Sequence, residues 1–175
     1  MVTILETTKL KELDFTIFSW YNIGMVTRSF EETYDYGFQF AKKLHGGEVI
    51  GLIGDLGSGK TSFVKGLAEG LGVNESVTSP TFVILKEYNI LRPNPHLRGV
   101  GKKVRSFIHV DAYRVEDIED IKSVGIEDYL GRDDVIVAIE WAEKVMEILP
   151  KDTISINFRY LSEKERRISI KFARA

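Results

Sequence analysis

Cysteine is absent from the 175-residue sequence, which excludes disulfides and any metal site built from thiolates. Long apolar runs are missing too. None approaches the ~20 residues that a transmembrane helix needs, and the N-terminus lacks the basic stretch and apolar core of a secretory signal. Because no feature directs the chain to a membrane, we expect a cytoplasmic protein.

The sequence also lacks an excess of charge of either sign. Its 24 basic and 26 acidic residues leave a formal net charge of −2. This balance argues against a globally basic nucleic-acid-binding protein but still allows a local basic patch. Internal repeats and low-complexity tracts are absent as well. The length suits one domain with a sizeable buried core.

What the sequence does contain is a phosphate-binding pattern. Residues 54–61 read Gly-Asp-Leu-Gly-Ser-Gly-Lys-Thr and fit G-x-x-x-x-G-K-[ST]. They follow the apolar run 49–53, which is typical of a strand buried on both faces. They open a segment with apolar residues at helical spacing, namely Phe63, Val64, Leu67, Ala68 and Leu71. Strand, loop and helix therefore stand in the order that the pattern requires.

The residue types in this loop suit phosphate chemistry. Gly54, Gly57 and Gly59 allow positive φ, so that successive backbone N–H groups can converge on phosphate oxygens at the start of a helix. Lys60 would reach the β- and γ-phosphates, and the Thr61 hydroxyl would hold Mg²⁺. The alternative is a glycine-rich turn before an ordinary helix, with Lys60 merely solvated.

Two acidic residues end predicted strands. The apolar segments 107–111 and 135–140 finish in Asp111 and Glu140, at the edge where ligands of open α/β sheets bind. Either carboxylate could face Mg²⁺ or the attacking water. Each alone would more often be a cap between strand and loop, but their occurrence together beside a phosphate loop favours function.

Hydroxyl groups gather in the segment 78–82, Thr-Ser-Pro-Thr-Phe, between the loop helix and the next strand. In phosphate-loop enzymes such a segment can order around the γ-phosphate and relax after hydrolysis. A plain Ser/Thr/Pro turn is the alternative.

The other patterns predict an α/β fold. We expect residues 26–175 to form a three-layer P-loop NTPase-like domain with a mostly parallel central sheet and added antiparallel strands. Residues 1–25 would be an N-terminal extension that is disordered, packs on the domain, or is absent from the natural product, since Met25 could be a translation start.

A helix is predicted after Ser29, which forms a capping box with Glu32. Its expected apolar stripe is Phe30, Tyr34, Phe38, Ala41 and Leu44. Further expected elements are strands over 82–90 and 104–110 around an exposed hairpin loop at 91–103, a helix over 115–124, a short helical segment that stops at Pro150, and two alternating strands paired across 161–165.

Four motifs occur in order along the chain: the phosphate loop 54–61, the segment 78–82, His109-Val-Asp-Ala-Tyr-Arg114, and Ile139-Glu-Trp141. Together they resemble the TsaE (formerly YjeE) family of bacterial ATPases, from about Ser29 to Phe172. The resemblance implies a small ATPase required for making threonylcarbamoyladenosine (t6A), the modified adenosine beside the anticodon of tRNAs that read codons beginning with A. Such proteins associate with a TsaD–TsaB pair, in which TsaD performs the transfer and ATP turnover would reset the complex.

The resemblance also implies roles for individual residues. Phosphate contacts would come from the loop residues Asp55, Leu56, Gly57, Ser58, Gly59 and Lys60. Mg²⁺ would be held by Thr61 and Glu140, and Asp111 would orient water or the metal shell. Lys60, Asp111 and Glu140 are thus the expected catalytic residues.

Two further positions match the family less specifically. Trp141 follows Glu140 as in the family, and an ordinary buried aromatic is an equal alternative. Thr33 matches a Glu-Glu-Thr feature near the adenine side, with a plain helix-surface position as its alternative.

The sequence departs from the family pattern in residues 1–25 and in a basic loop over 91–105. The loop carries Arg92, Arg98, Lys102, Lys103 and Arg105. These charges could contact tRNA phosphates or an acidic partner surface. A solvated hairpin tip is the alternative.

Other functions stay open on the sequence alone. A small-molecule or nucleotide kinase would use the same ATP site, although no second pocket motif with converging arginines is present. A nucleotide switch would bind ATP without splitting it. A GTPase is disfavoured because no Asn-Lys-x-Asp motif follows the loop. No arginine finger lies in a recognisable motif, so we expect slow turnover in isolation.

Overall fold

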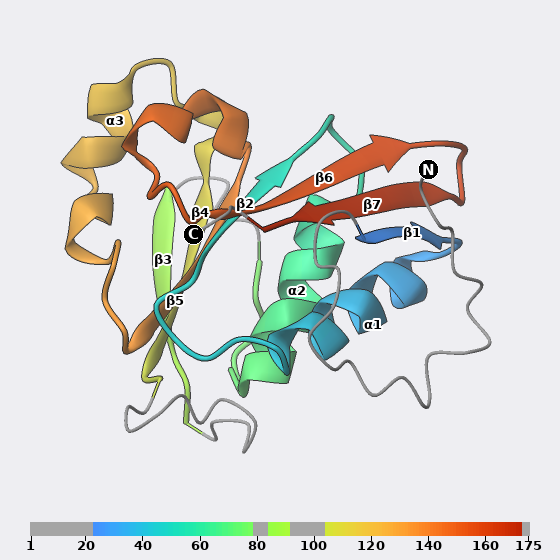
Figure 1. The fold of residues 1–175 in the computed structure, drawn as a ribbon, viewed down its shortest axis with the longest axis horizontal. Coiled ribbons are helices and arrows are strands. Elements are labelled where there is room, and N and C mark those ends of the chain that lie inside the picture. The colour runs from blue at the N-terminus through green and yellow to red at the C-terminus, as the bar shows by residue number, and fades with distance from the viewer. Residues whose placement is uncertain (1–22, 79–83, 92–103, 173–175) are drawn as a thin grey trace.

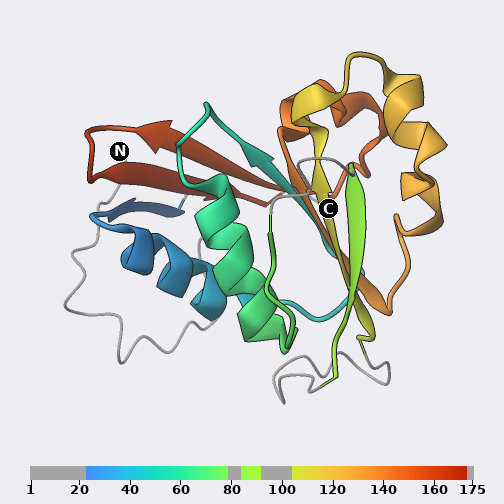
Figure 2. The same cartoon turned by 180° about the vertical axis from the view of Figure 1, so that it is seen from behind.

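The computed structural model describes residues 23–78, 84–91 and 104–172. These residues form one sheet of seven strands in the order β1-β7-β6-β2-β5-β4-β3, with helices on both faces (Figures 1 and 2). The strands are β1 Ile23–Thr27, β2 Val49–Ile53, β3 Leu85–Asn89, β4 Ser106–Asp111, β5 Val135–Glu140, β6 Ile154–Tyr160 and β7 Arg166–Lys171.

The centre of the sheet is parallel and its two margins are antiparallel, which confirms the predicted α/β fold. β6, β2, β5 and β4 run parallel to one another. β3 pairs antiparallel with β4, and β7 pairs antiparallel with both β6 and β1. Because the carboxyl ends of the parallel strands meet at one edge, the residues that follow β2, β4 and β5 are brought together there.

The helices complete a three-layer arrangement. α1, Phe30–Ala41, and α2, Lys60–Leu71, pack on one face, and α3, Ile118–Ser123, lies on the other (Figures 1 and 2). Short 3₁₀ turns accompany them at Ala112–Arg114, Ile126–Asp128, Ala142–Lys144 and Met146–Ile148. The buried apolar residues form two clusters, one on each face of the sheet.

The apolar pattern of each strand matches its place in the sheet. Every residue of β5 is buried, because Ile136 and Ala138 face the α1–α2 layer while Val135, Val137 and Ile139 face the α3 layer. β6 lies nearer the margin, and there burial alternates along the strand. The continuous and the alternating runs are therefore both confirmed as strands.

α1 begins after the predicted capping residue, but the side chains that face the core differ from the predicted stripe. Ser29 Oγ accepts a hydrogen bond from Glu32 N at 3.2 Å. The buried residues of this segment are Thr33, Gly37, Phe40, Ala41 and Leu44. Phe30 is 53% exposed, and Tyr34 and Phe38 are half-buried. The predicted stripe is therefore wrong at its first three positions.

Glycine is the reason for this difference. A Cβ at Gly37 would lie 2.1 Å from Phe63 O, and a Cβ at Gly66 would lie 1.9 Å from Tyr34 O. The backbones of α1 and α2 therefore approach each other more closely than larger side chains would allow. A periodicity that counts only large apolar residues misses this contact.

The predicted helix over 115–124 is shorter in the structure, because α3 begins only after Asp117. Asp117 Oδ1 accepts a hydrogen bond from Glu119 N at 3.2 Å, and Asp120 Oδ2 accepts one from Asp117 N at 3.1 Å. This capping box fixes the start of the helix. The segment before Pro150 forms two 3₁₀ turns rather than one helix.

Both predicted hairpins are present, and one strand is unpredicted. β6 and β7 pair across the turn at 161–165, and β3 pairs with β4. The loop tip at 92–103 and residues 79–83, which include most of the segment 78–82, lie outside the described residues. The unpredicted strand is β1, which pairs with β7 from its first residue. It crosses the expected boundary after residue 25, so residues 23–25 belong to the sheet.

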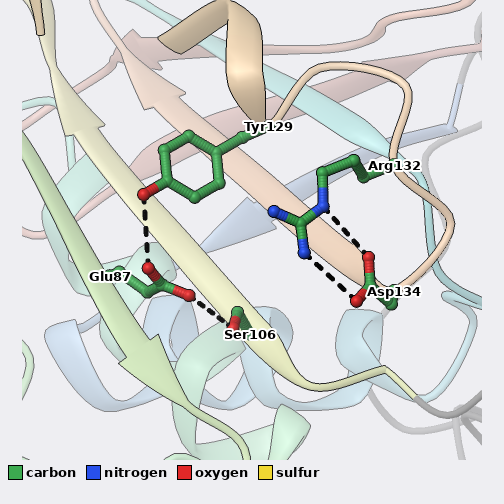
Figure 3. Close-up of polar contacts among 5 residues, drawn as sticks. All are labelled: Glu87, Ser106, Tyr129, Arg132 and Asp134. Carbon is green, nitrogen blue, oxygen red and sulfur yellow. Dashed lines mark hydrogen bonds and ion pairs between the residues drawn. The ribbon is translucent and has the colours of Figure 1, made fainter. Parts of the chain in front are cut away.

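A polar cluster joins β3, β4 and the start of β5 at the amino ends of the parallel strands (Figure 3). Glu87 Oε1 accepts from Ser106 Oγ at 2.6 Å, and Glu87 Oε2 accepts from Tyr129 OH at 3.2 Å. Arg132 donates to both carboxylate oxygens of Asp134 at 3.1 and 3.2 Å. The Arg132 guanidinium also holds the pKa of Asp134 below its usual range. This cluster lies at the edge of the sheet opposite the phosphate loop.

Within the described parts of the chain, no helix combines the length and apolar character needed to span a membrane.

Candidate nucleotide site

The phosphate loop leaves β2 in the middle of the sheet and ends at the first turn of α2. Gly54, Gly57 and Gly59 have φ values of 144°, 75° and 103°, a region that side-chain-bearing residues rarely adopt. A Cβ at Gly54 would lie 2.4 Å from Phe158 O. Gly59 caps α2 without a side-chain hydrogen bond to the first amides of the helix. The first amides of α2 thus have no side-chain cap, which is the feature that lets a helix N-terminus accept an anion.

Lys60 is held over this loop by backbone and aromatic contacts. Its Nζ donates to Gly54 O at 2.5 Å and to Asp55 O at 2.9 Å. The same atom lies 4.0 Å from the centroid of the Trp141 ring, a cation–π contact. Burial lowers the pKa of Lys60, while four carboxylates, including Glu140 and Asp111, act against this lowering. The ammonium is thus already placed at the loop, where polyphosphate would offer it a stronger partner.

Thr61 and Glu140 meet directly, although 79 positions separate them in sequence. Thr61 Oγ1 donates to Glu140 Oε2 at 2.8 Å. Glu140 ends β5, pairs in register with Leu52 of β2, and is only 2% exposed. A hydroxyl and a carboxylate side by side at the start of a phosphate-loop helix are the oxygen donors that Mg²⁺ accepts.

Asp111 ends β4 in register with Glu140, so the two acidic residues are brought together at one edge of the sheet. Its Oδ1 accepts a hydrogen bond from Tyr113 N at 3.0 Å and caps the 3₁₀ turn that follows. Asp111 therefore caps the turn, as the alternative interpretation predicts. It also stands at the sheet edge next to Glu140, where a catalytic carboxylate is expected.

Thr33 is buried rather than on the helix surface. It is 2% exposed, and its Cγ2 would lie 3.4 Å from a Cβ placed on Gly59. Its hydroxyl donates to Ser29 O at 3.0 Å and lies 2.8 Å from Thr27 Oγ1. Thr33 thus packs against the phosphate loop through its methyl group, while its hydroxyl is hydrogen-bonded to Ser29 and Thr27.

Arg166 also contacts the loop, and no sequence motif predicts it. From the first residue of β7, its Nη2 donates to Gly57 O at 3.3 Å. Its Nη1 donates to Ser162 O and Glu163 O, each at 3.0 Å. The guanidinium therefore ties the β6–β7 turn to the phosphate loop. Only its position after a hairpin turn could have drawn attention to it, and this carries no signal of a loop contact.

Trp141 has the one positive φ of a non-glycine residue among the described residues, 59°. The left-handed conformation turns the chain directly after Glu140. The indole ring lies over Lys60 and 5.0 Å from the Tyr113 ring. Its half-buried place beside the loop differs from that of an ordinary core aromatic. A strained backbone at this point is consistent with a functional constraint.

The residues present fit ATP with Mg²⁺. A Cβ at Gly57 would meet no atom of the described residues within 4 Å, and Ser58 Oγ is buried without a hydrogen-bond partner among those residues. Nowhere in the described ranges do three or more His, Asp or Glu side chains gather to hold a metal by themselves. Magnesium bound through one or two side chains plus substrate phosphates needs no such group.

Comparison with known proteins shows the family to which the chain belongs. The model of the family described as "Threonylcarbamoyl adenosine biosynthesis protein TsaE" matches residues 27–168. The chain belongs to the TsaE family. Its members are proteins of tRNA threonylcarbamoyladenosine biosynthesis, as the names of its curated relatives state.

Relatives from distant bacteria cover most of the chain. The TsaE protein of Treponema pallidum (strain Nichols) is 37% identical over 145 residues, which are 83% of this chain and 97% of that protein. TsaE of Haemophilus influenzae is 38% identical over 133 residues, 73% of this chain and 76% of its own. A crystal structure of Bacillus subtilis YdiB is 30% identical and has a TM-score of 0.66, with 90% of each chain covered. These similarities confirm the resemblance found in the motifs.

Proposed function

We propose that this TsaE-family protein binds ATP with Mg²⁺ and hydrolyses it to support t6A formation in tRNA, acting in the cytoplasm with a TsaD–TsaB pair. The observation that carries the proposal is the meeting of Lys60, Thr61 and Glu140 at one loop: the lysine on the loop carbonyls, and the hydroxyl bonded to the carboxylate. Membership of a t6A biosynthesis family supplies the context.

Phosphate binding would rest on backbone groups. The amides of the loop from Asp55 to Lys60 and the unpaired first amides of α2 would face the β- and γ-phosphates. Lys60 would exchange its carbonyl contacts for phosphate oxygens, which carry full charge. Thr61 and Glu140 would hold Mg²⁺, whose chemistry at this site is to neutralise charge on the phosphates.

Hydrolysis would follow in-line attack of water on the γ-phosphate. Asp111 lies beside Glu140 at the sheet edge and would orient that water or the shell of the metal. Arg166 is bound to four backbone carbonyls of the turn and the loop, so it would position the loop rather than act as an arginine finger. Turnover by the isolated protein would then be slow, and a partner would complete the site.

Two variants test this assignment. Lys60→Ala should remove most nucleotide affinity, whereas Glu140→Ala should reduce turnover more than binding, because only the lysine directly grips phosphate. Glu147→Ala, an exposed carboxylate on the 3₁₀ turn Met146–Ile148, is the control. Calorimetry would measure affinity, and phosphate release would measure turnover. Normal hydrolysis by Lys60→Ala or Glu140→Ala would refute the proposal.

The partner proposal needs its own experiment. ATP consumption without an acceptor, increased by added TsaD–TsaB, would support an ATPase. Strict dependence on a phosphate acceptor would instead favour the kinase alternative. The basic loop 91–105 is proposed to contact tRNA or the partner. A variant with its five basic residues neutralised should lose affinity for the TsaD–TsaB–tRNA assembly, and unchanged affinity would discard that contact.

A further inference from the structure

Besides Thr61, Glu140 has a partner that is buried, His109, which the proposed ATP chemistry does not use. His109 Nε2 lies 3.0 Å from Glu140 Oε1, and the side chain of His109 is fully buried. His109 stands on β4 in register with Ala138, two residues before Glu140 on β5. Side chains two residues apart on a strand share a face, so His109 and Glu140 both face the α2 layer.

The two oxygens of Glu140 are divided between two donors. Oε2 accepts from Thr61 Oγ1 at 2.8 Å, and Oε1 faces His109 Nε2. A carboxylate can only accept hydrogen bonds, so the ring nitrogen that faces it must be the donor. Rotation of the carboxylate away from Thr61 would break the bond to His109. The histidine therefore restrains the oxygen that points to the magnesium position.

Packing alone does not explain a histidine at this position. Its Nδ1 is buried and has no hydrogen-bond partner among the described residues, which is a cost that an apolar ring would avoid. The ring stacks on Phe107 with centroids 6.4 Å apart, and Phe107 stacks on Tyr88 at 6.2 Å. This stack fixes the plane of the imidazole and aims Nε2 at Glu140.

We propose that His109 is a positioning residue that holds Glu140 in the orientation required to bind Mg²⁺ together with Thr61. The proposal rests on the proposed Mg²⁺-ATP binding and adds a second residue behind the metal site. Groups that orient a metal ligand in this way commonly change metal affinity or activity by about 10- to 100-fold when they are removed.

The test measures the affinity for a non-hydrolysable ATP analogue in EDTA and in Mg²⁺, and takes the ratio of the two. His109→Phe should change the affinity in EDTA by no more than about twofold. The ratio of the affinity in Mg²⁺ to that in EDTA should fall about tenfold. His109→Gln, whose amide can donate to the same oxygen, should recover most of this ratio. Tyr88→Phe removes from the same stack a buried hydroxyl that has no partner in the described part of the chain, and it should keep the wild-type ratio.

Two results would overturn the role of His109. One is a Mg²⁺ ratio in His109→Phe equal to that of the wild type, whether or not both affinities fall together. The other is a further loss when His109→Phe is added to Glu140→Gln. Should His109→Phe fail to fold, His109→Met against His109→Gln gives a comparison at similar length without and with a donor. If the wild type binds nucleotide and the ratio does not respond, this inference alone fails. If the wild type does not bind nucleotide, the proposed function fails with it.

Discussion

At the scale of single residues, Arg166 joins two parts of the chain that are 109 positions apart. Its guanidinium reaches from the β6–β7 turn to Gly57 O, and its stem runs 3.8 Å from where a Cβ on Gly59 would lie. The aromatic ring of Tyr160 lies 5.1 Å from the same guanidinium. The contact joins the β6–β7 turn to the phosphate loop.

Arg166→Ala should therefore weaken nucleotide binding by about three- to tenfold, equivalent to roughly 1 kcal/mol for a hydrogen bond lost from a charged donor. In the variant the loop is no longer held in place before binding, so part of the binding free energy is used to order it. Calorimetric titration with ATP and Mg²⁺ would measure the effect. Arg159→Ala, an exposed arginine on β6, is the matched control and should bind like the wild type. Equal affinities for the two variants would contradict the prediction.

The sequence could reveal some of these residues and not others. Residues 54–61 form a local motif with a fixed spacing, and Asp111 and Glu140 each end an apolar run, so all three signals are readable along the chain. The contacts of His109 and Arg166 depend on which strands are neighbours and on where a hairpin turn lies. No local sequence pattern indicates strand order or side-chain direction, so these two contacts could be found only from the structure.

At the scale of helices and strands, glycines control the contact of α1 with α2. Besides Gly37 and Gly66, a Cβ on Gly70 would lie 2.6 Å from Ala41 Cβ and from Phe38 O. This close contact sets how α1 lies beside the loop helix, and through Thr33 it supports Gly59. Substitution of a glycine in this contact should thus lower the stability of the domain more than it changes nucleotide hydrolysis.

Gly66→Ala is expected to destabilise the protein by about 1–3 kcal/mol from overpacking, although alanine favours a helix by about 1 kcal/mol. The new methyl group would meet the backbone of Tyr34, which cannot move aside as a flexible side chain can. Denaturant unfolding would measure the change. Lys65→Ala, one residue earlier on α2, introduces the same side chain without entering the contact, so it should be nearly neutral. A Gly66→Ala variant as stable as Lys65→Ala would disprove the close packing.

Elements with a strong period were predictable, and elements set by packing were less so. α2 matches its predicted apolar residues because its buried face contains large side chains. The stripe of α1 was misplaced because Gly37 gives no hydrophobic signal, although it lies at the contact. β1 was missed because its pairing with β7 comes from a distant hairpin, and its residues Ile23–Thr27 show no clear alternation.

At the scale of the whole molecule, β1 closes one margin of the sheet and connects to the site through α1. Its five residues pair with β7, and the hydroxyl of Thr27, which is fully buried, lies 2.8 Å from that of Thr33. The domain therefore extends at least to residue 23, and the strand belongs to the structure that supports the loop.

Removal of residues 1–22 keeps all of β1 and every described residue of the site, so this variant is the reference for the melting temperature. Removal of residues 1–27 should lower the melting temperature by several degrees, since it exposes the edge of β7 and leaves Thr33 without its buried partner. Differential scanning calorimetry of the two truncated proteins would show the difference. An equal melting temperature for both would mean that β1 contributes nothing to stability.

The middle position of β2, with three strands on either side, has a consequence for how ligand and fold are coupled. Backbone amides of a central strand exchange with solvent only when the domain opens globally, not through fraying at its margins. A nucleotide bound at the loop after β2 must dissociate before or during the global opening that lets these amides exchange. Saturating nucleotide should slow deuterium uptake along β2 by the same free energy by which it stabilises the native state.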